Sequence, residues 1–242
     1  MKIRIIVLGG LILMAGAVIA GVKIARLTSY QLQSDKLVPR EKRLRWYVDQ
    51  TKARGEREVI LNAPFVDYGG SSMSTHVDDA LSHFSAVLAQ PIKSQVIAED
   101  SGDILTWYKF KIVDMLSEKN VPACPECSVP VPPQELLPIQ SNEFVMAKFG
   151  GTVTIDGVEV IMIDPTFPQL DLGKNYLLFI SKDSSGVATI GIGPNGVFTV
   201  DDKGTVLPFN KSPHPVKDDM DKQFGKALGK FKEHARHFSD KL

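Results

Sequence analysis

The middle of the chain alternates apolar and polar positions with a period of two, which is the pattern of half-buried β-strands. Strands are predicted, in chain order, for the stretches AVLAQPIKSQVIA, ILTWYKFKIVDML, EFVMAKFGG, GTVTIDGVEVIMID, NYLLFIS, GVATIGIG and GVFTVDDKGTVLPF. In the second stretch, the face that carries Tyr108, Phe110 and Ile112 is the better candidate for the core.

Tight turns join these predicted strands. Asp156-Gly157 lies between two alternating segments and is a strong hairpin signal, and residues 201–204 predict another turn. Many short strands joined by turns favour a mainly β domain over residues 75–210. The fold class that this predicts is a small antiparallel barrel or sandwich with flanking helices.

Residues 28–74 predict a basic helical connector ahead of the β domain, with a helix from Arg40 to about Arg54. Five of its basic residues, Lys36, Arg40, Lys42, Arg43 and Arg45, gather just before Trp46. Such a cluster beside a membrane segment suits anionic lipid headgroups, although a solvent-facing helix explains the same charges. A second helix is predicted in STHVDDALSHF, where Thr75 as N-cap and Asp78 resemble a capping box.

Residues 211–242 predict a C-terminal amphipathic helix. Apolar residues recur there every three or four positions, at Met220, Phe224, Leu228, Phe231, Ala235 and Phe238. The face formed by Phe224, Leu228 and Phe231 must be covered by other apolar groups. Packing against the β domain of the same chain is favoured, and a partner helix, through self-association or a protein partner, is the alternative.

The N-terminus carries the longest apolar segment of the chain. Residues 5–22, IIVLGGLILMAGAVIAGV, are uncharged and follow Lys2 and Arg4. A helix of this length rises about 27 Å, close to the thickness of the hydrocarbon core of a bilayer. Residues 1–27 therefore predict either a cleaved signal peptide or an uncleaved transmembrane signal anchor. Lys23 and Arg26 favour the anchor, because positive charge just past a cleavage site hinders export.

This segment makes the membrane the first expected partner. Lys2 and Arg4 favour a cytoplasmic N-terminus, whereas Lys23 and Arg26 favour the opposite orientation. Because the segment also resembles a signal, we expect a single-pass protein of the cell membrane with an extracytoplasmic domain. If the N-terminus is cleaved, the protein is secreted or periplasmic.

The charge of the chain argues against nucleic acid as a partner. Its 28 basic and 28 acidic residues give a formal net charge of zero at pH 7, so no overall field attracts nucleic acid. Trp107, Tyr108 and Phe110, with lysines between and after them, resemble a base-stacking platform. An aromatic core with exposed lysines explains the same residues.

Catalytic and cofactor motifs are absent from the sequence. It contains no Gly-x-Ser-x-Gly, no phosphate-binding loop and no Gly-x-Gly-x-x-Gly that opens a helix. His76 and His83 are seven residues apart, which places their rings about 10 Å apart on a helix, too far for one metal ion. No metal or cofactor is expected, and catalysis is disfavoured.

Cys124 and Cys127 lie in ACPECSVPVPP, within a proline-rich loop over residues 117–142. A thiol–disulfide exchanger needs its first cysteine at a helix N-terminus, and the SVPVPP that follows cannot begin a helix. A zinc site needs four ligands, and the sequence has no second Cys-x-x-Cys. A structural disulfide or a pair of idle thiols is favoured, and redox activity and metal binding are the alternatives.

Five segments within residues 75–208 form a recurring pattern of strands and turns: SAVLAQPIKSQ, LTWYKFKIVDML, the Gly150-Gly151 turn, FPQLDLGKNYLLFIS and GPNGVFTVDDKGTV. Together they resemble a recurrent domain of uncharacterised exported bacterial proteins. The shared pattern is a strand, a Thr-aromatic-x-Phe strand, a Gly-Gly turn and an F…G…YLLF segment, without the cysteine loop. The resemblance implies a small OB-like β domain.

These observations favour a membrane-anchored or secreted bacterial protein with a binding or scaffolding role. The alternative is an exported thiol-redox or metal-dependent enzyme that uses Cys124 and Cys127.

Overall fold

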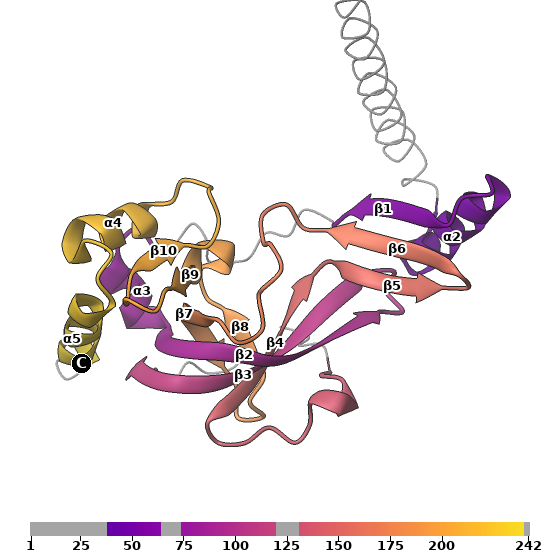
Figure 1. Ribbon diagram of the computed structural model, residues 1–242. Coiled ribbons are helices and arrows are strands. Elements are labelled where there is room, and N and C mark those ends of the chain that lie inside the picture. The colour runs from indigo at the N-terminus through magenta and orange to yellow at the C-terminus, as the bar shows by residue number, and fades with distance from the viewer. Residues whose placement is uncertain (1–37, 64–73, 120–130, 240–242) are drawn as a thin grey trace, which may run out of the picture.

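The computed structural model describes residues 38–63, 74–119 and 131–239 (Figure 1). The apolar segment 5–22, Lys36, Cys124 and Cys127 lie outside these ranges, so the predictions made for them stay predictions. Within the described ranges, no helix is long and apolar enough to cross a membrane.

The described strands form two sheets, so the prediction of a mainly β fold with flanking helices is confirmed. The larger sheet has the order β10-β9-β7-β2-β3-β4, with β8 paired to β7, and the smaller sheet has the order β1-β6-β5. The strands of the larger sheet are β2 (Ser85–Ala98), β3 (Ile104–Ser117), β4 (Glu143–Phe149), β7 (Asn175–Lys182), β8 (Ala188–Ile190), β9 (Val197–Val200) and β10 (Val206–Pro208). Those of the smaller sheet are β1 (Glu58–Asn62), β5 (Gly151–Ile155) and β6 (Val158–Ile163).

The larger sheet does not close into a barrel, which corrects one of the two predicted architectures. Between β4 and β8 the structure has one isolated parallel bridge, from Val145 to Val187. The amide of Val145 donates to the carbonyl of Gly186 at 3.0 Å. Val187 directly precedes β8, and β8 itself pairs with β7, so the contact with β4 stays a single bridge.

The β2–β3 hairpin contains the longest of the described strands and runs from the helical end to the smaller sheet (Figure 1). Tyr108 and Phe110 are buried on its predicted core face, against β4 and β7. Trp107, on the opposite face, is also buried, which the alternation did not predict. The reason is that Leu136, in the short 3₁₀ helix η2 (Gln134–Leu136), packs over it.

The smaller sheet packs against α2 (Arg43–Ala53), which follows the 3₁₀ turn η1 (Arg40–Lys42). Its β5–β6 hairpin turns at Asp156 and Gly157, both with positive φ, as the sequence predicted. Strand β1 was missed, because it pairs in parallel with β6, about a hundred residues later in the chain. Gly150 and Gly151 link the two sheets at β4–β5, where a Cβ on Gly151 would lie 2.6 Å from Val96.

The helical end consists of α3 (Val77–His83), α4 (Pro215–Phe224) and α5 (Leu228–Ser239), which cover one face of β2, β7 and β9. The 3₁₀ helix η3 (Gly193–Gly196) precedes β9. The C-terminal segment forms two helices instead of one, because Gly225 and Lys226 both adopt positive φ and turn the chain. The N-cap of α3 is His76, one residue later than predicted, and Thr75 instead bonds to the Asp79 carboxylate.

Candidate functional site

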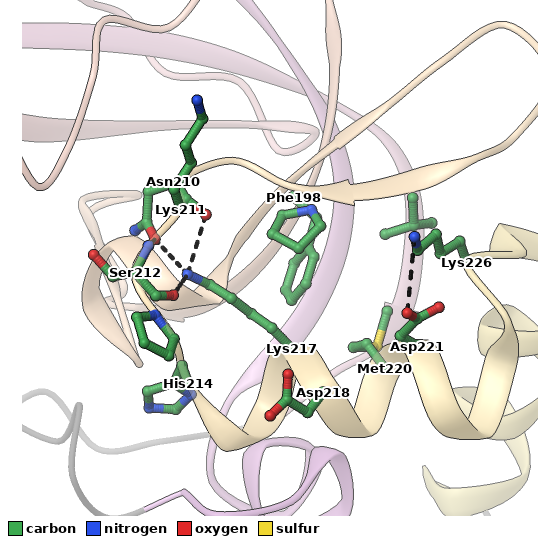
Figure 2. Close-up of a pocket in the computed structure, with 13 residues that line it drawn as sticks. Phe198, Asn210, Lys211, Ser212, His214, Lys217, Asp218, Met220, Asp221 and Lys226 are labelled. Atoms are coloured by element: carbon green, nitrogen blue, oxygen red, sulfur yellow. Dashed lines mark hydrogen bonds and ion pairs between the residues drawn. The ribbon is translucent and has the colours of Figure 1, made fainter.

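A cavity of about 420 Å³ opens between α4 and the β9–β10 hairpin (Figure 2). Its floor is apolar and consists of Phe198, Val206 and Met220, which belong to the same core cluster. The remaining lining residues are largely polar or proline and come from the segment before α4, from α4 itself and from the turn after it: Pro208, Asn210, Lys211, Ser212, Pro213, His214, Lys217, Asp218, Asp221 and Lys226.

Local sequence explains how the walls of this cavity form. Pro215 occupies the first turn of α4, where its missing N–H costs no hydrogen bond. The ring of His214, the N-cap residue, accepts a hydrogen bond from the amide of Val216 at 3.3 Å. Val216 and Met220 are four residues apart on α4 and both point into the core. The adjacent face of α4, which carries Lys217 and Asp221, therefore lines the cavity beside the β9–β10 hairpin.

Lys217 is the buried cation of this cavity, with an exposed fraction of 6%. Its ammonium donates to the Asn210 carbonyl at 3.3 Å, to the Asn210 side-chain oxygen, and to the Ser212 carbonyl at 2.6 Å (Figure 2). Burial lowers the pKa of Lys217 to about 8, although the Asp218 carboxylate opposes this shift. All three N–H donors are used, so Lys217 braces the 210–212 segment and shapes the cavity.

The rim of the cavity carries charges of both signs. Asp221 and Lys226 form an ion pair of 3.7 Å, and both side chains are about half exposed. Asp218 and Lys211 are exposed on the same rim. A ligand here would meet an apolar floor and a polar mouth, which is the usual arrangement of small-molecule sites.

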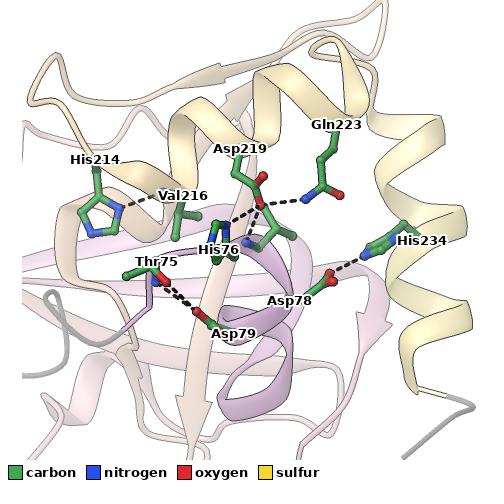
Figure 3. A network of polar contacts seen from close by, with 10 residues as sticks. Thr75, His76, Asp78, Asp79, His214, Val216, Asp219, Gln223 and His234 are labelled. Atoms are coloured by element: carbon green, nitrogen blue, oxygen red, sulfur yellow. Dashed lines mark hydrogen bonds and ion pairs between the residues drawn. The ribbon is translucent and has the colours of Figure 1, made fainter.

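Polar contacts hold the three helices together behind this cavity (Figure 3). The Asp219 carboxylate of α4 accepts hydrogen bonds from the Val77 amide and the Gln223 side chain, each at 2.8 Å. It therefore caps the N-terminus of α3 from another helix. On α5, the His234 ring lies 2.6 Å from the Asp78 carboxylate, which ties α5 to α3. These contacts join α4 and α5 to α3.

A second hollow, of about 270 Å³, lies where the two sheets meet. It is lined by Lys148 of β4, by residues of β5 and β6, and by the segment that follows β6: Gly151, Thr152, Ile161, Met162, Ile163, Asp164, Phe167, Pro168 and Gln169. Lys148 has an exposed fraction of 3%. Burial lowers the pKa of Lys148 to about 8, and attraction to Asp164 opposes the shift.

Two of the basic residues predicted to contact a membrane surface form ion pairs within the chain. Arg40 forms an ion pair of 2.6 Å with Asp103, and Arg45 pairs with Asp156 at the β5–β6 turn. The Asp156 carboxylate has a lowered pKa, because Arg45 donates a hydrogen bond to it. These pairs offset part of the positive charge of the cluster.

The other members of this cluster have different surroundings. Arg43 donates from Nε to the Val38 carbonyl at 3.4 Å, and Lys42 is exposed. Trp46 is partly buried and lies edge-on to Tyr47, with ring centroids 5.0 Å apart. The described cluster is therefore part of the surface of η1 and α2 next to the smaller sheet.

The predicted partner-helix face packs inside the chain. Phe224, Leu228 and Phe231 are all buried in the cluster under α3, β2, β7 and β9. The Phe224 and Phe231 rings meet edge to face at 5.5 Å, and Phe231 also contacts Phe179 of β7. The β domain therefore covers this stripe.

The two buried lysines were missed, although the sequence contains a signal for each. Lys148 follows Phe144 and Met146 at intervals of two, on the inward face of β4. Lys217 precedes Met220 by three positions, on the inward face of α4. A charged residue in phase with an apolar stripe is the pattern that would have identified both.

The two buried lysines line the two hollows, and Cys124 and Cys127, the residues of the metal alternative, lie outside the described ranges. Across the described residues, no three histidine or carboxylate side chains lie close enough together to hold a metal ion. The buried cations instead line hollows of a size that a small molecule or a smaller group can enter. Comparisons of this chain with protein-family models, with curated proteins and with solved structures found no match.

Proposed function

We propose that this chain is a membrane-tethered binding module whose ligand lies in the α4 cavity, the hollow between α4 and the β9–β10 hairpin. The observation that carries the proposal is the combination of an apolar floor, a charged rim and a braced wall around about 420 Å³. Small-molecule sites have volumes of roughly 300–1,000 Å³ and a similar division of polar and apolar lining.

Pre-organisation supports a binding role. Lys217 fixes the 210–212 segment through hydrogen bonds to Asn210 and Ser212, so the cavity wall needs little ordering when a ligand arrives. A preformed site loses less conformational entropy on binding than a flexible one. The apolar floor and the mixed charges of the rim fit an amphipathic small molecule with one charged end.

The strand order supports an OB-like module, which the resemblance also implies. Strands β2, β3 and β4 follow one another, β8 meets β4 at the parallel Val145–Val187 bridge, and β7 pairs with both β8 and β2. Five-stranded, partly open barrels of this order occur in OB-like folds, whose common role is binding. The role we propose is therefore binding, with the surrounding helices as additions.

The tether is residues 5–22, and the described domain lies on the extracytoplasmic side. The apolar length of that segment supports this arrangement. Cell fractionation with N-terminal sequencing of the mature protein tests it. Full-length protein in the membrane fraction with Met1 retained is the expected result, and full-length protein dissolved in the cytosol would refute it.

Two probes that share an indole ring test the α4 cavity in full-length protein held in lipid nanodiscs. Indole-3-acetate is anionic and tryptamine is cationic, and ligand-observed NMR measures binding of each. We expect one of them to bind, and the preferred charge then identifies the rim group that directs it. If neither probe binds the wild type more strongly than it binds the Asp218→Trp variant, in which the mouth of the cavity is blocked, the proposal is contradicted.

Asp218→Trp blocks the mouth of the cavity without entering the core, because Asp218 is exposed on the rim. It is expected to abolish the binding signal. Lys222→Trp, four residues further along α4, is exposed and does not line the cavity, so it is the matched control and should bind normally. Asp218→Asn separates the loss of charge from the added bulk.

A further inference from the structure

Lys148 lies in the second hollow, away from the α4 cavity, and its surroundings differ from those of Lys217. Its side chain extends from the inward face of β4, in phase with Phe144 and Met146. The hollow reaches solvent past Thr152 and Pro168, which are exposed. Lys148 is therefore a buried amine that a small molecule can reach.

The ammonium of Lys148 has hydrogen-bonding capacity that the protein does not use. Its nitrogen lies 5.6 Å from the centroid of the Phe167 ring, and Asp164 attracts it from beyond ion-pair distance. No oxygen of the described residues accepts a hydrogen bond from it, in contrast to the three acceptors around Lys217. Because the side chain lines the open hollow, a ligand oxygen that enters the hollow could accept a hydrogen bond from this ammonium.

Charge balance indicates what kind of oxygen the ligand carries. The Asp164 carboxylate, held by the Thr166 and Phe167 amides at 2.8 and 3.0 Å, already offsets the positive charge of Lys148. An anionic ligand would add a second buried negative charge, whereas a carbonyl oxygen adds none. A neutral carbonyl compound is therefore the better match.

We infer that Lys148 is a reactive amine that captures a small aldehyde or ketone in this hollow as an imine. The neutral amine nitrogen attacks the carbonyl carbon and forms the C–N bond. The nitrogen gives up its two protons, the carbonyl oxygen leaves with them as water, and a C=N bond remains. No oxidant or reductant is needed. The Phe167 ring and Asp164 stabilise the positive charge of the protonated imine.

The protonation state of Lys148 agrees with this role. Its pKa of about 8 leaves about a tenth of the amine neutral at pH 7, whereas an exposed lysine with a pKa near 10.4 is neutral in well under a thousandth of molecules. Desolvated lysines are the ones that proteins use for imine chemistry. Lys217 has the same lowered pKa and provides an internal control for the effect of geometry.

The test is reductive labelling of the full-length protein in nanodiscs with acetaldehyde and cyanoborohydride at pH 7.5. Peptide mass spectrometry then measures the rate of N-ethylation at each lysine. We expect Lys148 to react at least tenfold faster than Lys217 and the exposed lysines. In urea the difference should disappear, because the fold creates it. Equal rates at Lys148 and Lys217 in the native protein would overturn the inference.

A variant provides a second, independent readout. Lys148→Arg keeps the charge but cannot form the imine, and it should lose the fast phase of labelling while the slow phase of the other lysines remains. If a fast phase of unchanged size persists in this variant, the reactive amine is another group and the inference fails. The wild-type comparison decides the question if the variant does not fold.

Discussion

The helical end and the sheet junction each bury a lysine, and they treat it in opposite ways. At the helical end, Lys217 finds three oxygen acceptors in the 210–212 segment. At the junction, Lys148 has an aromatic ring and a distant carboxylate. Burial lowers the pKa of both to about 8, so burial alone does not distinguish them. The two lysines differ in their hydrogen bonds: the N–H donors of Lys217 all have acceptors within the protein, whereas those of Lys148 are left for a ligand.

The neighbouring groups repeat this contrast. The helical end also uses Asp219 to cap α3 and the His234–Asp78 contact to tie α5 in place. At the junction, the Thr106 hydroxyl donates to the Gly150 carbonyl at 2.6 Å, and the Gly150-Gly151 link leaves no room for a side chain. One region is held by polar contacts between helices, and the other by close backbone packing beside an unfilled donor.

Removing the cation at the helical end is expected to have the largest effect. Lys217→Met leaves the Asn210 and Ser212 oxygens without their donor and should lower the free energy of unfolding by about 3 kcal/mol. Urea denaturation followed by tryptophan fluorescence measures it. Lys222→Met, on the exposed face of the same helix, is the control and should leave stability unchanged. A loss below about 0.5 kcal/mol would show that the three hydrogen bonds do not brace the loop.

The dependence of stability on pH sharpens the contrast. The pKa of Lys148 is about 8 in the fold and near 10.5 in the unfolded chain, so the unfolded chain binds more protons between these values. Stability contributed through Lys148 therefore rises as pH increases from about 8 to 10.5. Relative to Lys148→Met, the wild type should gain about 2 kcal/mol between pH 7.5 and 10. If urea denaturation gives the same dependence of stability on pH for the wild type and for Lys148→Met, this expectation is refuted.

Asp219→Ala tests the capping contact at the helical end. It removes the acceptor of the buried Val77 amide and should lower the free energy of unfolding by about 1.5 kcal/mol. Hydrogen exchange at the Val77 amide should accelerate at the same time. Asp221→Ala, on the same helix with an exposed side chain, should change neither quantity. Unchanged exchange at Val77 in the first variant would mean that Asp219 does not cap α3.

Lys148→Met is expected to have the smallest effect and the opposite sign from Lys217→Met. The change removes an ammonium that pays for desolvation without an acceptor, and the apolar replacement can pack against Phe167. Stability at pH 7.5 should rise by about 1 kcal/mol, measured by urea denaturation. If Lys148→Met lowers the free energy of unfolding as much as Lys217→Met does, both lysines are structural and the proposed difference between them is wrong.

Local sequence patterns predicted most of the strands. The branched and aromatic residues of β2, β3 and β7 and the Asp156-Gly157 turn were sufficient, because strand period and turn chemistry are local properties. Strand β1 was missed because its partner is distant in the chain. The break at Gly225 was hidden by an apolar stripe that continues on both sides of it. Whether the larger sheet closes into a barrel depends on contacts between distant residues, such as Val145 and Val187, and no local sequence pattern predicts such contacts.

The candidate sites were harder to predict than the fold. Lys148 and Lys217 stand in phase with apolar positions, but phase alone does not reveal how many acceptors surround a buried amine. That number depends on the paths of residues 210–212 and 164–167, which are irregular segments. The predicted sites at the cysteines and at Lys36 lie outside the described residues, and the basic cluster of α2 is partly paired with Asp103 and Asp156.

The length of the β2–β3 hairpin has a consequence for how the module would present its ligand. The described chain begins at Val38 beside α2, and the α4 cavity lies at the other end of the molecule (Figure 1). With residues 5–22 as the tether, the α4 cavity would lie at the end of the domain far from Val38, the first described residue after the tether. A soluble molecule could then reach the cavity by diffusion from the bulk phase, without passing along the bilayer surface.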